Sequence, residues 1–147
     1  MLKEVLKENL VTTELEGNNK REIIYNLLKL LYKSGSVSDF DKALNDILAN
    51  EGRMSTGMEN GIAIPHAKSD TVDTLIAAVG ISKRKIDFEC LDRRPAQIFV
   101  MTLSPKDSGG PHVKFLSEIG KLLRNRKHRK AVLEAKTDRE LLEALTS

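Results

Sequence analysis

The sequence has few of the residues that would support a disulfide-linked, membrane-spanning or base-stacking protein. Cys90 is its one cysteine, so no disulfide can form within the chain, as is typical of a reducing compartment. Tryptophan is absent and aromatic residues make up only 4%, which disfavours a surface for base stacking. No apolar run approaches the roughly 20 residues that a membrane helix needs. We therefore expect a cytoplasmic protein without direct membrane insertion.

The composition is that of a folded domain. Hydrophobic residues make up 40% and charged residues 31% of the 147 residues, which argues against a largely disordered chain. A chain of this length suits one domain, residues 1–147, and can bury a core without disulfides or metal. The net charge of +3 suits an acidic protein or a phosphorylated ligand as readily as a nucleic acid.

Two helices are expected in the first third of the chain. Apolar residues recur at helical spacing from Lys20 to Lys33, with Asn19 as a cap and Gly35 as a terminator. Ser38 and Asp41, at the spacing of a capping box, announce a second helix. We expect the two helices to pair as a hairpin.

The middle of the chain changes to short apolar runs. Gly61–Ile64, Leu75–Ile81 and Ala96–Leu103 are bounded by Pro, Gly, Asp and Ser, which predicts mostly buried strands of one sheet. A further short strand is expected around Ile86 and Phe88.

Helices return in the last third. A helix should begin at or near His112 and run to Arg124, a segment around 131–133 follows, and Thr137 with Glu140 begins a last helix. Helices, then strands, then helices predict an α/β (α+β) domain whose sheet is covered by helices.

The stretch from Ser55 to Ala67 carries the most information about function. It is a turn-rich loop that leads into a buried strand ending at Pro65. Pro65 fixes its own φ and biases Ile64 towards an extended conformation, so His66 should be held rigidly at the strand end, where functional residues often lie. A lone histidine usually has no task, but this setting favours a reactive one.

Ser55-Thr56-Gly57, followed by Asn60 to His66, resembles the phosphorylation-site signature of the fructose/mannitol-type enzyme IIA domains of the bacterial phosphotransferase system, including its nitrogen-related branch. The resemblance covers nearly the whole chain, because the helical hairpin, Ile86-Asp87-Phe88 and Pro111-His112 follow in the family's order. It implies a single IIA type-2 domain, in which a mixed β-sheet is flanked by helices on both sides.

The resemblance implies a phosphotransferase component that needs no cofactor and no metal. His66 would accept a phosphoryl group from an HPr-like carrier protein and pass it to an enzyme IIB domain. His112 would orient His66 or contact the phosphoryl group, and the hydroxyls of Ser55 and Thr56 would bind it. The residue types suit this role, because a neutral imidazole is a competent nucleophile for in-line phosphoryl transfer. The first turn of a helix also disfavours protonation of His112 and offers free N–H groups to an anion.

Two residues depart from the family pattern. Asn50-Glu51 stands where the family commonly has Arg-Glu, and Glu59 stands where a small residue is frequent. Asparagine lacks the charge and the planar fork that arginine offers to phosphate oxygens. Arg53 is the nearest substitute, and we predict that it joins Ser55 and Thr56 in phosphoryl binding.

A regulatory protein of the same fold is the main alternative. In that case phosphorylation of His66 would control binding to a protein target instead of feeding sugar uptake. A chain without attached IIB or membrane domains leans slightly towards this regulator.

Nucleic-acid and metal binding are less favoured. The basic run Lys121–Lys130 has helical apolar spacing and no interleaved aromatic residues, so we interpret it as a solvated helix face. His66, His112 and His128 are too widely separated to match a short metal-ligand motif. We therefore expect neither a nucleic-acid partner nor a metal.

Overall fold

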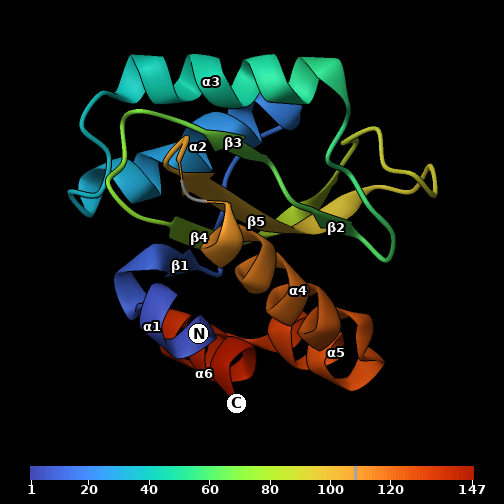
Figure 1. Ribbon diagram of the computed structural model, residues 1–147. Helices are drawn as coiled ribbons and strands as arrows, with labels where there is room; N and C mark the ends of the chain where they lie inside the picture. Colours follow the sequence, from blue (N-terminus) through green and yellow to red (C-terminus); the bar gives the residue numbers. More distant parts are fainter. Residues whose placement is uncertain (108) are drawn as a thin grey trace.

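A mixed five-stranded sheet forms the middle layer of the fold, with helices on both faces (Figure 1). The structure, a computed structural model, describes residues 1–107 and 109–147. Its strands are β1 (Val11–Thr12), β2 (Ile62–Ala63), β3 (His66–Lys68), β4 (Ile76–Ile86) and β5 (Ala96–Ser104). Its helices are α1 (Leu2–Val5), α2 (Lys20–Lys33), α3 (Phe40–Arg53), α4 (Gly110–Arg124), α5 (Arg126–Glu134), α6 (Asp138–Thr146) and the 3-10 turn η1 (Glu8–Leu10).

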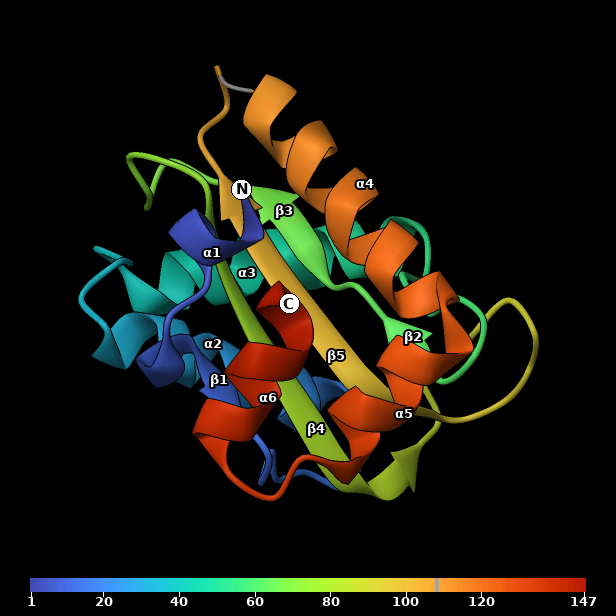
Figure 2. The same ribbon diagram turned by 90° about the horizontal axis from the view of Figure 1, so that it is seen from below.

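Different helices cover the two faces of the sheet. Helices α2 and α3 cover one face of the sheet, and α1, α4, α5 and α6 cover the other, on the side where both chain ends lie (Figures 1 and 2). The predicted α/β arrangement with helices on both sides of a mixed sheet is therefore confirmed, as is the pairing of the first two long helices.

Strand β5 is the centre of the sheet. The order is β1-β4-β5-β2, and β3 also pairs with β5. Strands β4 and β5 are antiparallel, whereas β1 is parallel to β4, and β2 and β3 are parallel to β5. Strand β2 pairs with Ile98 and Phe99, and β3 pairs with 102–104. Strands β2 and β3 thus occupy one edge of β5 in succession.

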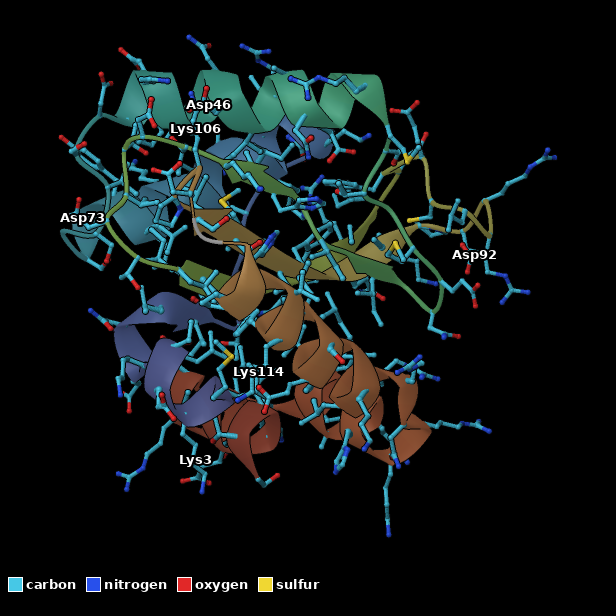
Figure 3. The ribbon with its side chains drawn as sticks, viewed as in Figure 1. Lys3, Asp46, Asp73, Asp92, Lys106 and Lys114 are labelled. Atoms are coloured by element: carbon cyan, nitrogen blue, oxygen red, sulfur yellow. The ribbon has the colours of Figure 1, made fainter. Side chains whose placement is uncertain are left out.

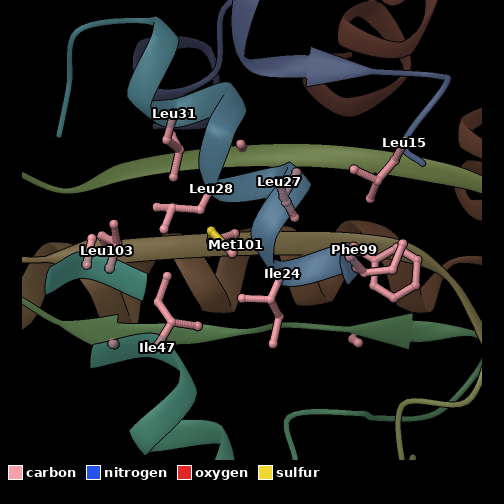
Figure 4. Packing of buried hydrophobic residues seen from close by; sticks show 14 of the residues in the cluster. Leu15, Ile24, Leu27, Leu28, Leu31, Ile47, Phe99, Met101 and Leu103 are labelled. Carbon is pink, nitrogen blue, oxygen red and sulfur yellow. The ribbon is translucent and has the colours of Figure 1, made fainter. Parts of the chain in front are cut away.

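Alternation along β5 divides its side chains between two cores. Phe99 and Met101 belong to the core under α2 and α3 (Figure 4). Ile98 and Val100 belong to the core formed with α4, α5 and α6. Because strand side chains alternate with period two, Thr102 lies on the α4 side as well.

The caps of α2 and α6 agree with the sequence, but that of α3 does not. Asn19 accepts from the Glu22 N–H at 2.9 Å, and Thr137 accepts from the Glu140 N–H at 3.1 Å. The predicted cap at Ser38 is wrong, because the Ser38 hydroxyl and N–H both donate to the carbonyl of Thr71. Asp39 caps the helix one residue later.

The predicted separate strand around Ile86 and Phe88 is also wrong. Strand β4 continues past Ile81 through an irregularity and ends at Ile86, which pairs with Ala96. Phe88 lies beyond the strand and is fully buried. Phe88 is an apolar core residue two positions after Ile86, and this spacing in the sequence resembles that of a strand.

His66 opens a strand instead of following one. The predicted strand Gly61–Ile64 is reduced to β2, and the chain returns to the edge of β5 at His66. Pro65 has no N–H to donate, but its carbonyl accepts from the Thr102 N–H at 3.1 Å. The proline therefore interrupts the strand pairing along this edge of β5, and the pairing resumes at His66.

The C-terminal helices agree with their predicted positions. His112 is the third residue of α4, and the segment around 131–133 is part of α5. Within residues 1–107 and 109–147, no helix is both long and apolar enough to cross a lipid bilayer.

Asp39→Ala should lower the free energy of unfolding by about 1 kcal/mol, because the Lys42 N–H loses its acceptor at the start of α3. Urea unfolding monitored by circular dichroism measures this loss. Asp41→Ala is the matched control, since Asp41 lies in the first turn but does not provide the cap. An equal loss in both variants would contradict the assignment of the cap.

Candidate functional site

Two histidines from distant parts of the chain meet on the α4 side of the sheet. Ala67 belongs to the core under α2 and α3, so its strand neighbours His66 and Lys68 lie on the opposite face. His112 approaches that face from the first turns of α4. The two imidazole rings have a centroid separation of 5.5 Å and an interplanar angle of 51°. The two rings therefore lie against one another.

The His66 ring is held by the backbone of its own strand segment. Its Nδ1 lies 2.8 Å from the carbonyl oxygen of Ile64. A carbonyl oxygen can only accept, so Nδ1 carries the hydrogen, and in a neutral imidazole Nε2 then keeps the lone pair. His66 is partly exposed. Its Nε2 is therefore the nucleophilic nitrogen of the ring.

Thr102 holds the ring of His112. The Thr102 Oγ1 lies 2.8 Å from His112 Nε2, and both residues are buried. Among residues 1–107 and 109–147 this nitrogen is the acceptor available to the Thr102 hydroxyl proton. A hydrogen on Nε2 would leave that buried proton without an acceptor, which costs free energy. The contact therefore favours the tautomer in which His112 carries its hydrogen on Nδ1.

The surroundings of His112 keep its ring neutral. Burial lowers the pKa of His112 from its ordinary value of 6.5, and the nearby His66 and Lys68 lower it further. A neutral ring in the Nδ1–H form can donate one hydrogen bond without adding a positive charge.

A tight turn brings the loop after α3 back to His66. Asn60 and Gly61 have φ values of 61° and 76°, and the Ile62 N–H donates to the Glu59 carbonyl. This is the Asn-Gly pattern of a hairpin turn in which both central residues are left-handed. The returning Ile64 N–H donates to the Thr56 carbonyl at 3.0 Å. The turn thereby places the loop beside β2 and the start of β3.

The two loop hydroxyls donate to other protein groups. The buried Thr56 donates its hydroxyl to Glu51 Oε1 at 2.6 Å and its N–H to Glu51 Oε2 at 2.8 Å. Ser55 donates its hydroxyl to the Phe88 carbonyl at 2.7 Å. Both side chains line the same groove as His66. In this arrangement they support the loop, and their predicted role as phosphoryl donors requires those bonds to rearrange.

Lys20 completes the support of the loop from the start of α2. Its ammonium lies 2.9 Å from Glu51 Oε2, 2.9 Å from Glu89 Oε1 and 4.8 Å from the centroid of the Phe88 ring. Burial acts to lower the pKa of Lys20, but hydrogen bonds and attraction to the two carboxylates outweigh it, and the pKa is raised. The buried Glu51 is therefore paired with a cation.

Of the two residues that depart from the family pattern, Asn50 contacts His66 directly. Asn50 donates its amide Nδ2 to the His66 carbonyl at 2.8 Å, so it holds the backbone of that residue. Arg53 is exposed at the end of α3, and Glu59 is exposed in the turn. Both line the same groove.

A groove of about 800 Å³ lies in front of His66. One wall is α4, and the other is the loop after α3 with β2 and Ile64. The lining is largely apolar, and Met54 is 78% exposed. Its lining residues include Met54, Met58, Ile62, Ile64, Leu116 and Leu123, with Arg53, Glu59 and Arg124 as the charged members.

The structure brings together most of the residues that the sequence suggests. His66, Ser55, Thr56 and Arg53 line one groove, and His112 lies against His66. His128 is elsewhere, on α5 beyond the far end of α4 (Figure 1). In the part of the chain that the structure describes, no group of three His, Cys, Asp or Glu side chains is arranged to hold a metal ion.

Sequence reasoning missed several residues of the site. Thr102 lies in an otherwise apolar strand, and its position between Met101 and Leu103 is the one available signal. Lys20 and Asp92 give no local signal at all. Asp92, labelled in Figure 3 on the loop between β4 and β5, accepts from the Asn60 N–H at 3.2 Å. These contacts join segments that only the folded chain brings together.

Comparison with known proteins adds a family match. Residues 4–147 match the family model described as "Phosphoenolpyruvate-dependent sugar phosphotransferase system, EIIA 2". A fructose-specific EIIA component from Haloferax volcanii is 35% identical over 92% of this chain and 88% of its own. A nitrogen regulatory protein from Klebsiella oxytoca is 30% identical over 99% of this chain and 90% of its own. The fructose-specific EIIABC component of Bacillus subtilis is 32% identical over 97% of this chain, which spans only 22% of that longer protein.

Solved structures share the fold. The nitrogen regulatory protein IIA-Ntr from Neisseria meningitidis has a TM-score of 0.89 at 22% identity, over 97% of each chain. Enzyme IIA mannitol from Escherichia coli, solved as a complex with phosphorylated enzyme IIB mannitol, has a TM-score of 0.82 at 17% identity, over 96% of each chain.

The His112 ring should titrate below pH 6.5 in a proton NMR titration, because burial and neighbouring positive charge disfavour its protonated form. Since the pKa is lower in the folded state, the unfolded state binds more protons below pH 6.5, and stability should fall as the pH drops from there towards the folded pKa.

The matched variant is His112→Gln, which cannot titrate. Its free energy of unfolding should depend less steeply on pH in the same window. Titration of His112 at or above its ordinary value would contradict the assignment.

Proposed function

This chain belongs to the EIIA 2 family of the phosphoenolpyruvate-dependent sugar phosphotransferase system, and we propose that it carries a phosphoryl group on His66. The donor is an HPr-like phosphocarrier protein, and the acceptor is a IIB domain. The observation that carries the proposal is the His66 ring, whose Nδ1 is tied to the Ile64 carbonyl while the ring faces His112.

Acceptance of the phosphoryl group is an in-line displacement at phosphorus. The lone pair of His66 Nε2 forms the new N–P bond while the N–P bond of the donor phosphohistidine breaks, and that electron pair stays with the donor imidazole. The Nδ1–H bond to Ile64 stabilises the positive charge that the His66 ring gains. Transfer to the IIB domain reverses these roles, with His66 Nε2 as the leaving group.

His112 assists by contacting the transferred group. Thr102 donates to Nε2 of this ring, and the Nδ1–H has no acceptor among residues 1–107 and 109–147, so it can donate to an oxygen of the phosphoryl group. Because the ring is neutral, it orients that group without holding it as tightly as a cation would, which suits a carrier that must release it.

Regulation of a protein target is the second candidate function. The 30% identity to a nitrogen regulatory protein over almost the whole chain favours it. Asn50 also favours it, since a neutral amide at this position binds the His66 carbonyl instead of offering a charge to the phosphoryl group. In this version the chemistry at His66 is the same, but the phosphorylated state changes the affinity for a target.

Incubation with phosphoenolpyruvate, enzyme I and HPr should add a single acid-labile phosphoryl group, measured by intact mass. His66→Ala should abolish the addition, because it removes the nucleophile. His112→Ala should slow it about 100-fold, the usual effect of losing one preorganised donor. His128→Ala is the matched control and should behave as wild type. Addition of the group to folded His66→Ala would refute the proposal.

Onward transfer separates the two candidate functions. A carrier should lose the phosphoryl group when a IIB domain is added, with rapid return of the unmodified mass. A regulator should keep it in the presence of IIB domains and show a different affinity for its target with and without the group.

Thr102→Val should release the His112 ring from the Nδ1–H tautomer, because the isosteric side chain has no proton to donate to Nε2. Nitrogen-15 NMR of the histidine rings reads the tautomer directly, and phosphoryl acceptance should slow about tenfold, in keeping with the net value of one hydrogen bond. Thr102→Ser keeps the hydroxyl and should retain the wild-type spectrum and rate. An unchanged tautomer in Thr102→Val would show that the threonine does not set it.

A further inference from the structure

Lys20 occupies an unfavourable place for a lysine. It is the first residue of α2, where the helix dipole disfavours a cation. Its side chain is only 19% exposed, although lysine side chains are mostly exposed in folded proteins. Neither the helix nor the protein surface therefore accounts for a lysine here, and the reason must lie in the contacts of its ammonium group.

A chain of hydrogen bonds leads from this ammonium group to the reactive ring. Lys20 Nζ donates to Glu51 Oε2 at 2.9 Å, and the same carboxylate accepts from both the N–H and the hydroxyl of Thr56. The Thr56 carbonyl accepts from the Ile64 N–H at 3.0 Å. The Ile64 carbonyl in turn lies 2.8 Å from Nδ1 of His66. The start of α2 is thereby connected to the imidazole of His66.

The Glu51 carboxylate is the link of this chain that depends on a cation. Its side chain is only 5% exposed, and Lys20 is its one ion-pair partner among the residues that the structure describes. A buried carboxylate without a counter-ion is strongly disfavoured. Without Lys20 the carboxylate would be stabilised by turning towards water, which would take an acceptor away from Thr56.

The outer contact of Lys20 contributes less than the inner one. Glu89 Oε1 also lies 2.9 Å from the ammonium group, but the Glu89 side chain is 74% exposed. Water screens such a pair, and exposed ion pairs contribute little to stability. The contact with Glu51 is therefore the one through which Lys20 acts on the loop.

We propose that Lys20 is a positioning residue for phosphoryl transfer, which acts through Glu51 and Thr56 to hold the Ile64 carbonyl against His66 Nδ1. The inference rests on the proposed function of His66. The hydrogen bond to Ile64 keeps the hydrogen on Nδ1 and the lone pair on Nε2. A displaced carbonyl would leave fewer rings in this reactive tautomer. Lys20 itself takes no part in the chemistry.

The test compares Lys20→Met with Lys20→Arg, which keeps the charge, and with Lys29→Met, which removes an exposed lysine of the same helix. Each variant is phosphorylated either by phosphorylated HPr or by phosphoramidate, a small donor whose P–N bond breaks to release ammonia as His66 Nε2 takes the phosphoryl group. Nitrogen-15 NMR reads the tautomer of His66, and thermal melting reports whether each variant is folded.

Lys20→Met should label His66 about tenfold more slowly with either donor, because a less well-held ring is in the reactive form less often. With HPr the loss should appear in kcat, while KM stays unchanged. The NMR spectrum should show a mixture of tautomers in place of the Nδ1–H form. Lys20→Arg should keep most of the wild-type rate and spectrum, and Lys29→Met should match wild type.

A double variant separates positioning from support of the fold. Lys20→Met combined with Glu51→Gln leaves no buried charge unpaired, so it should melt at a higher temperature than Lys20→Met alone. The glutamine offers one acceptor oxygen where Thr56 uses two, so slow labelling should persist. The double variant also gives a folded protein to measure if Lys20→Met alone does not fold.

A folded Lys20→Met with the wild-type tautomer and rate would overturn the proposal, as would a double variant that regains the wild-type rate together with its stability. A loss confined to HPr would overturn it too, because the defect would then lie in docking. Failure of phosphorylated HPr to label wild-type His66 would instead refute the proposed function, so the two failures can be told apart.

Discussion

The parallel pairing of His66 with Thr102 is the constraint on which the site depends. The register sets both side chains on the same face of the sheet, because Ala67 and Met101 take the opposite face and enter the core under α2 and α3. Thr102 can then hold His112, and His112 can lie against His66. A shift of one residue would point His66 into the apolar core and away from Thr102 and His112.

The loop after α3, on the other side of the groove from α4, supports the pairing of His66 with Thr102. Asn50 binds the His66 carbonyl from α3, and the buried Glu51 binds both polar groups of Thr56. Lys20 balances the charge of Glu51. A buried carboxylate that loses its cation is strongly destabilising, so the start of α2 and the end of α3 are tied to the loop together. The support of the loop is therefore partly ionic.

The neutrality of the His112 ring follows from where α4 begins. The start of α4 lies over the sheet, so His112 is buried and adjacent to another imidazole, and its pKa falls. A protonated pair at this distance would repel and would bind a phosphoryl group more strongly. A neutral His112 suits the proposed transient binding of a phosphoryl group at His66.

The sequence alone determined the mixed layered fold and most of its helices and strands, because apolar periodicity is a local signal. Its resemblance to the IIA family singled out His66 and His112 as candidate site residues. The fold decided the rest. Asp39 caps α3 because Thr71, distant in sequence, takes the polar groups of Ser38. Thr102 contributes only after β3 and α4 have come together at β5. Such roles depend on which segments become neighbours, a property of tertiary packing that no local pattern encodes.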